Sequence, residues 1–161
     1  MKVTKQFLTK HSACSSGMTF VTEHNLIGTD EIHFIRELVT HGKLEWAVWL
    51  LVRRLNRVNT IKFAFFCARD VLPIFEAKYP NDDRPRKAIE AAELCITANT
   101  KANRSTADAA RAAAYAADAA YAADAAYAAG RAEAYAETIS AALKRYIEYG
   151  LTLLAEKGRG A

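Results

Sequence analysis

The chain has 161 residues, a formal net charge of +4 and 52% hydrophobic residues. That length suits one domain, and the apolar fraction is enough for a packed core and too high for a disordered chain. The longest run of bulky apolar residues, Trp46 to Val52, is too short to cross a bilayer, and the first residues lack the apolar run of a secretory signal. Three cysteines, an odd number with wide gaps, favour reduced thiols in a cytoplasm over a disulfide framework.

Residues 1–28 are punctuated by Gly17 and Gly28, which predicts short helical turns ahead of the main body. The body begins with a helix for which Thr29 or Asp30 is the expected N-cap, since their side-chain oxygens can accept hydrogen bonds from first-turn amides. Apolar residues then recur at helical spacing, and the pattern ends at Gly42, as is typical of helix C-termini. This apolar stripe consists of Ile32, Ile35, Leu38 and Val39.

The segment from Lys43 to about Asn56 is apolar almost all round, which predicts the most buried helix, anchored by Trp46 and Trp49. Residues 59–79 again follow the helical period. Pro73 lies inside that second segment. Because proline lacks an amide donor and clashes with the preceding turn, we expect the helix to bend or split near residues 71–72.

A further helix is predicted from Arg84 to Ile96. Pro85 suits the first helical position, where its missing amide is not needed, and Asp82 or Asp83 can cap the helix start. A polar break follows at residues 100–104. We therefore assign residues 29–100 to the helical body.

Residues 105–156 are predicted to form a long alanine-rich helical segment, because alanine has the highest helix propensity. Within it Tyr-Ala-Ala-Asp-Ala-Ala repeats, and each three-residue step rotates about 300° around a helix. The tyrosines therefore face several sides, so Tyr115, Tyr121 and Tyr127 are candidate contacts with a partner, or with a second copy in a homodimer. Gly130 is the expected interruption, and the bulkier apolar stripe after it should dock onto the front of the chain. The whole predicts an all-α protein, one compact helical bundle over residues 1–161.

A basic cluster, formed by Arg53, Arg54, Arg57 and Lys62, follows the most apolar helix. The excess of basic over acidic residues lies in residues 1–104, so this cluster could meet phosphate or an acidic protein surface. A nucleic-acid or nucleotide-binding protein is therefore the alternative function, although no recognised nucleic-acid-binding motif accompanies the charge. The structural interpretation is that cations favour the C-terminus of a buried helix.

Two loose groups of metal-ligating residue types occur. One is His33, Glu37 and His41, spaced four residues apart, and the other is His11, Cys14 and His24. Neither has the spacing of a known metal motif, and a solvated helix face and a capped turn explain them better. The sequence also lacks a glycine-rich phosphate loop and a nucleophile elbow, so we predict no metal, no cofactor and no enzymatic activity.

The run from Tyr79 to Ala92, Tyr-Pro-Asn-Asp-Asp-Arg-Pro-Arg-Lys-Ala-Ile-Glu-Ala-Ala, precedes a polar break and an alanine-rich tract. In this it resembles a family of immunity proteins of bacterial polymorphic toxin systems, which has many phage and prophage relatives. The N-terminal pattern is similar to the opening of the phage-type members through Phe7-Leu8, Ala13-Cys14, Gly17 and Phe20. The family is mostly helical, in agreement with the hydrophobic periodicity.

This resemblance implies a non-enzymatic binding protein in the cytoplasm of a bacterial host, which neutralises a protein partner by occluding it. The partner would be a toxin or, for a phage-type member, a host defence component. The family offers no catalytic residue to transfer. Arg84 and Arg86 in the matching run are candidate partner contacts, or they pair with Asp83 or Glu90, and a structural role explains their positions better.

Overall fold

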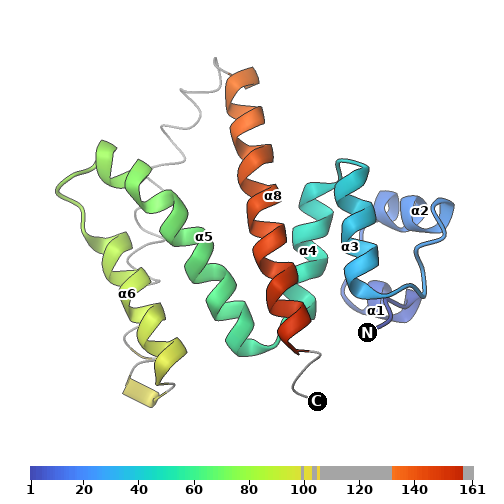
Figure 1. Cartoon of the computed structure of the whole chain (residues 1–161), viewed down its shortest axis with the longest axis horizontal. Helices are drawn as coiled ribbons and strands as arrows, with labels where there is room; N and C mark the ends of the chain where they lie inside the picture. The colour runs from blue at the N-terminus through green and yellow to red at the C-terminus, as the bar shows by residue number, and fades with distance from the viewer. Residues whose placement is uncertain (99, 103–104, 106–131, 158–161) are drawn as a thin grey trace. The chain divides into compact units, whose positions relative to one another are not determined.

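The computed structural model describes residues 1–98, 100–102, 105 and 132–157 (Figure 1). These residues form α-helices joined by turns, with one isolated β-bridge between Lys2 and Asp30. The chain is all-α, as the sequence predicted. It divides into two compact units: Met1–Leu55 together with Ser140–Ala161, and Asn56–Ile139. None of the described helices is long and apolar enough to cross a membrane.

The first unit begins with four helices, and a side-chain N-cap starts each of the first three. They are α1 (Lys5–Lys10), α2 (Ser15–Glu23), α3 (Glu31–Thr40) and α4 (Leu44–Arg54). Asp30 caps α3, because its Oδ1 accepts a hydrogen bond from the Ile32 amide at 2.9 Å. After α3, Gly42 adopts a φ of +68°, a conformation that glycine enters without steric cost. The two short N-terminal helices, the Asp30 cap and the stop at Gly42 confirm the sequence-based prediction.

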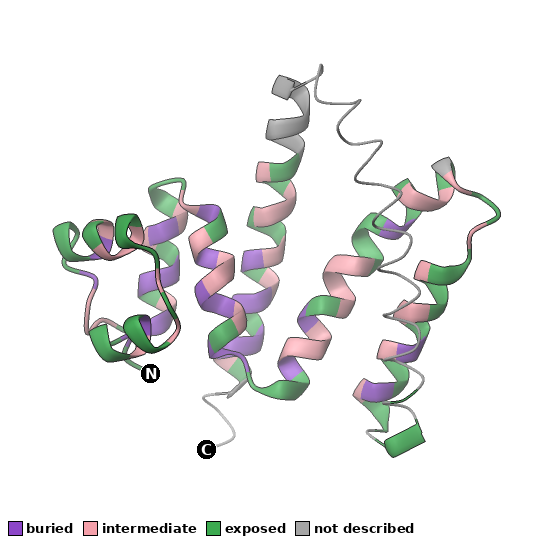
Figure 2. Cartoon of the chain, turned by 180° about the vertical axis from the view of Figure 1, so that it is seen from behind, coloured by how far each residue is buried: buried purple, intermediate pink, exposed green. Residues whose placement is uncertain are grey.

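The C-terminal helix α8 (Ala132–Lys157) contributes its residues from Ser140 onward to the same unit. That part of α8 lies alongside α4, and buried residues gather there (Figures 1 and 2). Gly150 permits the approach, because a Cβ at this position would overlap the Leu51 side chain. The predicted docking of the C-terminal apolar stripe is thereby confirmed through Ile147, Leu151 and Leu154, all buried. Ile139, which precedes these residues on α8, is 43% exposed.

The core of this unit draws on α3, α4 and α8. Its largest fully buried side chains are Phe34, Ile35, Leu38, Leu50, Leu51, Ile147 and Val3. Burial of such side chains from water is the main term that stabilises a small helical unit. The predicted buried helix is confirmed as α4, but Trp46 and Trp49 are only half-buried, so leucines rather than indoles form its inner face.

The second unit contains α5 (Arg57–Lys78) and α6 (Arg84–Thr97), which pack against each other. Asn56 caps α5, since its Oδ1 accepts from the Asn59 amide at 2.9 Å. The helix continues through Pro73, so the expected split does not occur. Pro85 stands in the first turn of α6, as predicted. The buried side chains of the pair include Phe63 and Leu72 on α5, and Ala91 and Cys95 on α6.

Candidate functional site

Arg54 does not belong to an exposed basic cluster. Its side chain is 8% exposed, and its Nε donates to Glu31 Oε2 at 2.6 Å. The guanidinium also lies over the Phe7 ring, 4.6 Å from the centroid. A buried cation requires a partner of opposite charge, and Glu31, itself 7% exposed, supplies it from α3. The sequence-based assignment of Arg54 to a partner-binding surface is therefore corrected.

The other members of the predicted cluster are distributed over both units. Arg53 is exposed in the first unit, where its guanidinium stacks 4.1 Å from the Trp49 ring and donates to the Trp49 carbonyl at 3.0 Å. Arg57 and Lys62 belong to α5 in the second unit, Arg57 exposed and Lys62 half-buried. No single unit therefore presents all four residues of the predicted cluster.

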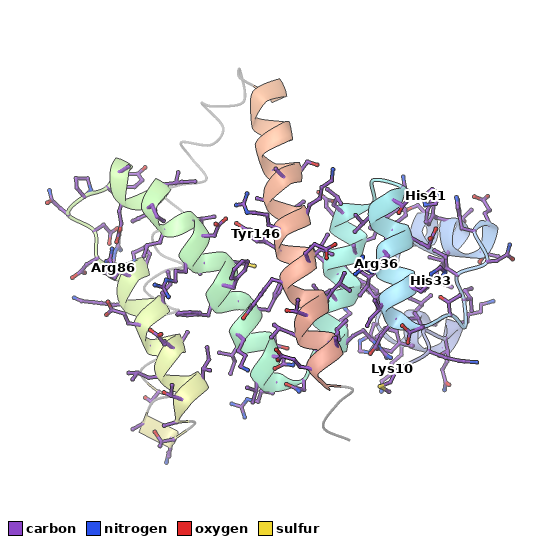
Figure 3. All side chains as sticks on the ribbon, in the orientation of Figure 1. Lys10, His33, Arg36, His41, Arg86 and Tyr146 are labelled. Carbon is purple, nitrogen blue, oxygen red and sulfur yellow. The ribbon has the colours of Figure 1, made fainter. Side chains whose placement is uncertain are left out.

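Arg84 and Arg86 are exposed but already paired within the second unit. Arg84 binds Asp82 through Nε at 2.8 Å and through its Nη2 at 2.6 Å. Arg86 binds both carboxylate oxygens of Glu76 on α5, each at 2.7 Å. Figure 3 labels Arg86 near the start of α6. The expected pairing with Asp83 or Glu90 is corrected, because Asp83 pairs with Lys87 at 2.8 Å.

The Arg84 pair also explains the start of α6. The Asp82 carboxylate accepts from the Arg84 amide at 3.2 Å as well as from the guanidinium. The hydrogen bond from the Arg84 side chain lowers the pKa of Asp82, and the same bond raises the pKa of Arg84. Of the two aspartates predicted as possible caps, Asp82 accepts a hydrogen bond from the first-turn amide of Arg84. Asp83, at the N-cap position, makes no side-chain cap bond.

The tyrosines predicted to contact a partner, Tyr115, Tyr121 and Tyr127, lie outside the described residues, as does Gly130.

A pocket of about 280 Å³ lies in the first unit, between the α1–α2 turn and helices α2, α3 and α4. Its walls are mostly apolar, and Trp46 and Trp49 are its largest side chains. The sequence contains no other tryptophan. The lining consists of Leu8, Ser12, Ala13, Cys14, Gly17, Val21, Phe34, Leu38, Glu45, Trp46, Trp49 and Leu50. Sequence reasoning missed this pocket, although two tryptophans three residues apart in an apolar helix were a signal that could have marked a surface hollow.

Cys14 lies in the lining of this pocket and is exposed. Its thiol is 3.4 Å from the Ser16 hydroxyl and accepts from the Gly17 amide at 3.4 Å, so Cys14 is the N-cap of α2. The hydrogen bond with Ser16, and then that from Gly17, lowers the pKa of the Cys14 thiol. Burial raises the pKa of the Cys67 thiol to about 11, and Cys95 is buried. Cys14 is thus the most exposed thiol of the three, since Cys67 is half-buried.

The histidines assemble differently from the two groups that the sequence suggested. His24 and His41 come from different groups, yet their ring centroids are 4.5 Å apart, and the Phe20 ring stacks on His24 at 4.0 Å. Each imidazole Nδ1 is 2.9 Å from the backbone carbonyl four residues earlier. His33 stands elsewhere along α3 (Figure 3). In the part of the chain that the structure describes, no three His, Cys, Asp or Glu side chains are arranged to hold a metal ion.

Comparison with known proteins assigns the family. A search of curated proteins and a search of solved structures each gave no match. The family model described as "Imm-5 like putative immunity protein" matches residues 50–160, well over half of the chain. Apart from Leu50, the residues that line the pocket precede this range. The chain belongs to the Imm-5 like putative immunity protein family.

Proposed function

We propose that this protein is a non-enzymatic immunity protein that neutralises a protein partner by binding and occluding it. The observation that carries the proposal is the family match over residues 50–160. An immunity protein acts as a stoichiometric ligand, so its function requires a stable complementary surface and no turnover. The partner is a toxin or a host defence component in a bacterial cytoplasm, and both are proteins that such a surface can occlude.

The arrangement of charge supports a protein partner over a nucleic acid. Nucleic-acid affinity comes largely from several cations that neutralise neighbouring phosphates. Here Arg54 is buried against Glu31, and Arg84 and Arg86 are balanced by carboxylates. Of the remaining cations of the predicted cluster, Lys62 is half-buried, which leaves Arg53 and Arg57 as its exposed members.

The experiment is purification of the affinity-tagged full chain from bacteria that also express its genomic neighbours. We expect one neighbour to elute with the tagged chain in a fixed molar ratio on size exclusion, and mass spectrometry to identify it. Growth inhibition by that neighbour, expressed alone, should be relieved by the chain. A chain that elutes as free monomer with every neighbour tested, and relieves no toxicity, would contradict the proposal.

A further inference from the structure

The pocket of the first unit has the character of an anchor site. Fully packed interiors leave few voids larger than a water molecule, whereas this pocket has a volume of about 280 Å³. Its apolar floor comes from side chains such as Leu38 and Leu50, and its walls include the two half-buried tryptophans. Protein interfaces draw most of their binding energy from a few large side chains that fill such pockets.

The charges around the two indoles restrict the side chain that can enter. The Lys43 ammonium lies 5.2 Å from the Trp46 ring centroid, and the Arg53 guanidinium lies 4.1 Å from that of Trp49. Both indoles therefore already hold a cation from this chain. A further cation, such as an arginine of a partner, would be repelled by these two, so a neutral aromatic side chain fits better.

The lining of the pocket also contains one carboxylate, that of Glu45. This residue is exposed and forms no ion pair within the described ranges 1–98 and 132–157. An ionised carboxylate accepts hydrogen bonds and cannot donate them. The occupant that matches both the apolar walls and this carboxylate is an aromatic side chain with a hydrogen-bond donor at its tip.

We propose that this pocket anchors one tyrosine or tryptophan side chain of the protein partner, with the ring beside Trp46 and Trp49 and the hydroxyl or indole N–H donating to Glu45. The choice of a protein as the source of this side chain rests on the proposed function. The matched family range does not account for the pocket, since almost all of its lining precedes residue 50. The proposed anchor therefore lies mostly on the N-terminal helices, outside the matched range.

The two tryptophans make the pocket directly observable. Because the chain has two tryptophans and both line the pocket, the two indole N–H signals of an NMR spectrum report on this site alone. The probe is the capped peptide acetyl-Gly-Tyr-Gly-amide, with the corresponding phenylalanine and alanine peptides as controls. We expect the tyrosine peptide to shift both signals, with a dissociation constant of the order of 1 mM for so small a ligand. The phenylalanine peptide should bind about tenfold more weakly, and the alanine peptide should shift neither signal.

Two changes test the assigned residues. Glu45→Gln replaces the charged acceptor by a neutral group of the same shape, and should bring the affinity of the tyrosine peptide down toward that of the phenylalanine peptide. Disulfide attachment of a benzylthio group to Cys14, the accessible thiol in the lining, should fill the pocket and abolish the shifts. Reduction with dithiothreitol should restore them, and an unchanged circular dichroism spectrum of the blocked protein shows that it was still folded.

The outcomes are decisive. Unshifted indole signals with the tyrosine peptide, or equal affinity for the tyrosine and phenylalanine peptides, would overturn the proposal. A shift by free p-cresol without one by the tyrosine peptide would also overturn it, since the site would then admit a small molecule and exclude a polypeptide. If the chain forms its stoichiometric complex but the peptides do not shift the indole N–H signals, only this proposal fails. If the peptides bind and no complex forms, the anchor for an aromatic group stands and the proposed function fails.

Discussion

The Arg54 guanidinium on α4 donates through Nε to the Glu31 carboxylate on α3 at 2.6 Å, with both side chains more than nine-tenths buried. The N-terminal ammonium of Met1 reaches the other carboxylate oxygen of Glu31 at 3.4 Å. This pair joins the first turn of one helix to the last turn of the next. The pair therefore holds α3 and α4 together. These two helices contribute Leu38 and Leu50 to the lining of the pocket.

Removal of one member of this pair should be costly. Arg54→Met leaves the Glu31 carboxylate buried without its main partner, and we expect the free energy of unfolding to fall by about 3–5 kcal/mol. The double variant Glu31→Leu/Arg54→Met removes both charges and should recover most of that loss. Urea unfolding followed by circular dichroism measures both. Arg53→Met is the control, because Arg53 is exposed, and it should cost less than about 1 kcal/mol. Equal losses in the single and double variants would contradict the pairing.

The contact of Gly150 with Leu51 should not tolerate one added methyl group. In Gly150→Ala the new Cβ overlaps the Leu51 side chain, and we expect a loss of about 1–3 kcal/mol despite the better helix propensity of alanine. Glu148→Ala on the exposed side of the same helix is the control and should change stability little. Thermal unfolding compares the two. If Leu51→Ala partly rescues Gly150→Ala in a double-mutant cycle, the loss comes from this contact.

The three thiols should differ in reactivity with pH. Because the pKa of Cys14 is lowered and that of Cys67 is raised to about 11, iodoacetamide should modify Cys14 first at pH 7–8. Ser16→Ala removes the bond that contributes most to the lowered pKa, so the midpoint of the rate–pH profile should move to higher pH. Ser15→Ala, at the neighbouring exposed position, should leave the midpoint in place. Peptide mapping by mass spectrometry follows each site, and faster labelling of Cys67 than of Cys14 would refute the assignment.

Pro73 offers a stabilising substitution. The helix α5 continues through this residue, although proline provides no amide for the helical ladder. Pro73→Ala restores that donor at an exposed position, so we expect the free energy of unfolding to rise by about 1–3 kcal/mol. Glu93→Ala on the exposed face of α6 is the comparison and should have a small effect. A lower melting temperature for Pro73→Ala would mean that the proline ring itself stabilises α5.

The sequence predicted those features that depend on neighbours in the chain. Asp30 before an apolar stripe, Gly42 after it and Pro85 at a helix start are local signals, and each stands where it was expected. At Pro73 the local rule allowed the helix to split, whereas α5 continues through this residue. The role of Arg54 could not be predicted, since its partner Glu31 lies 23 residues away and only packing brings them together.

The pocket was beyond sequence reasoning for a related reason. Cys14, Leu38 and Trp46 lie on three different elements, and a hollow exists only once those elements are placed. The apolar pattern of α4 correctly indicated burial. It could not distinguish the leucines that are fully covered from the tryptophans that remain half-exposed, because both residue types belong to the same periodic pattern.

The approach of Gly150 to Leu51 also governs when the protein can complete its fold during synthesis. The first unit combines residues 1–55 with residues from Ser140 onward, and Ile147, Leu151, Leu153 and Leu154 are the last of its buried hydrophobic residues to be translated. Helices α1 to α4 leave the ribosome long before α8 does, with the α4 surface around Leu51 uncovered. The first unit can therefore close only after α8 has been translated, and until then the apolar surface around Leu51 stays open to other contacts.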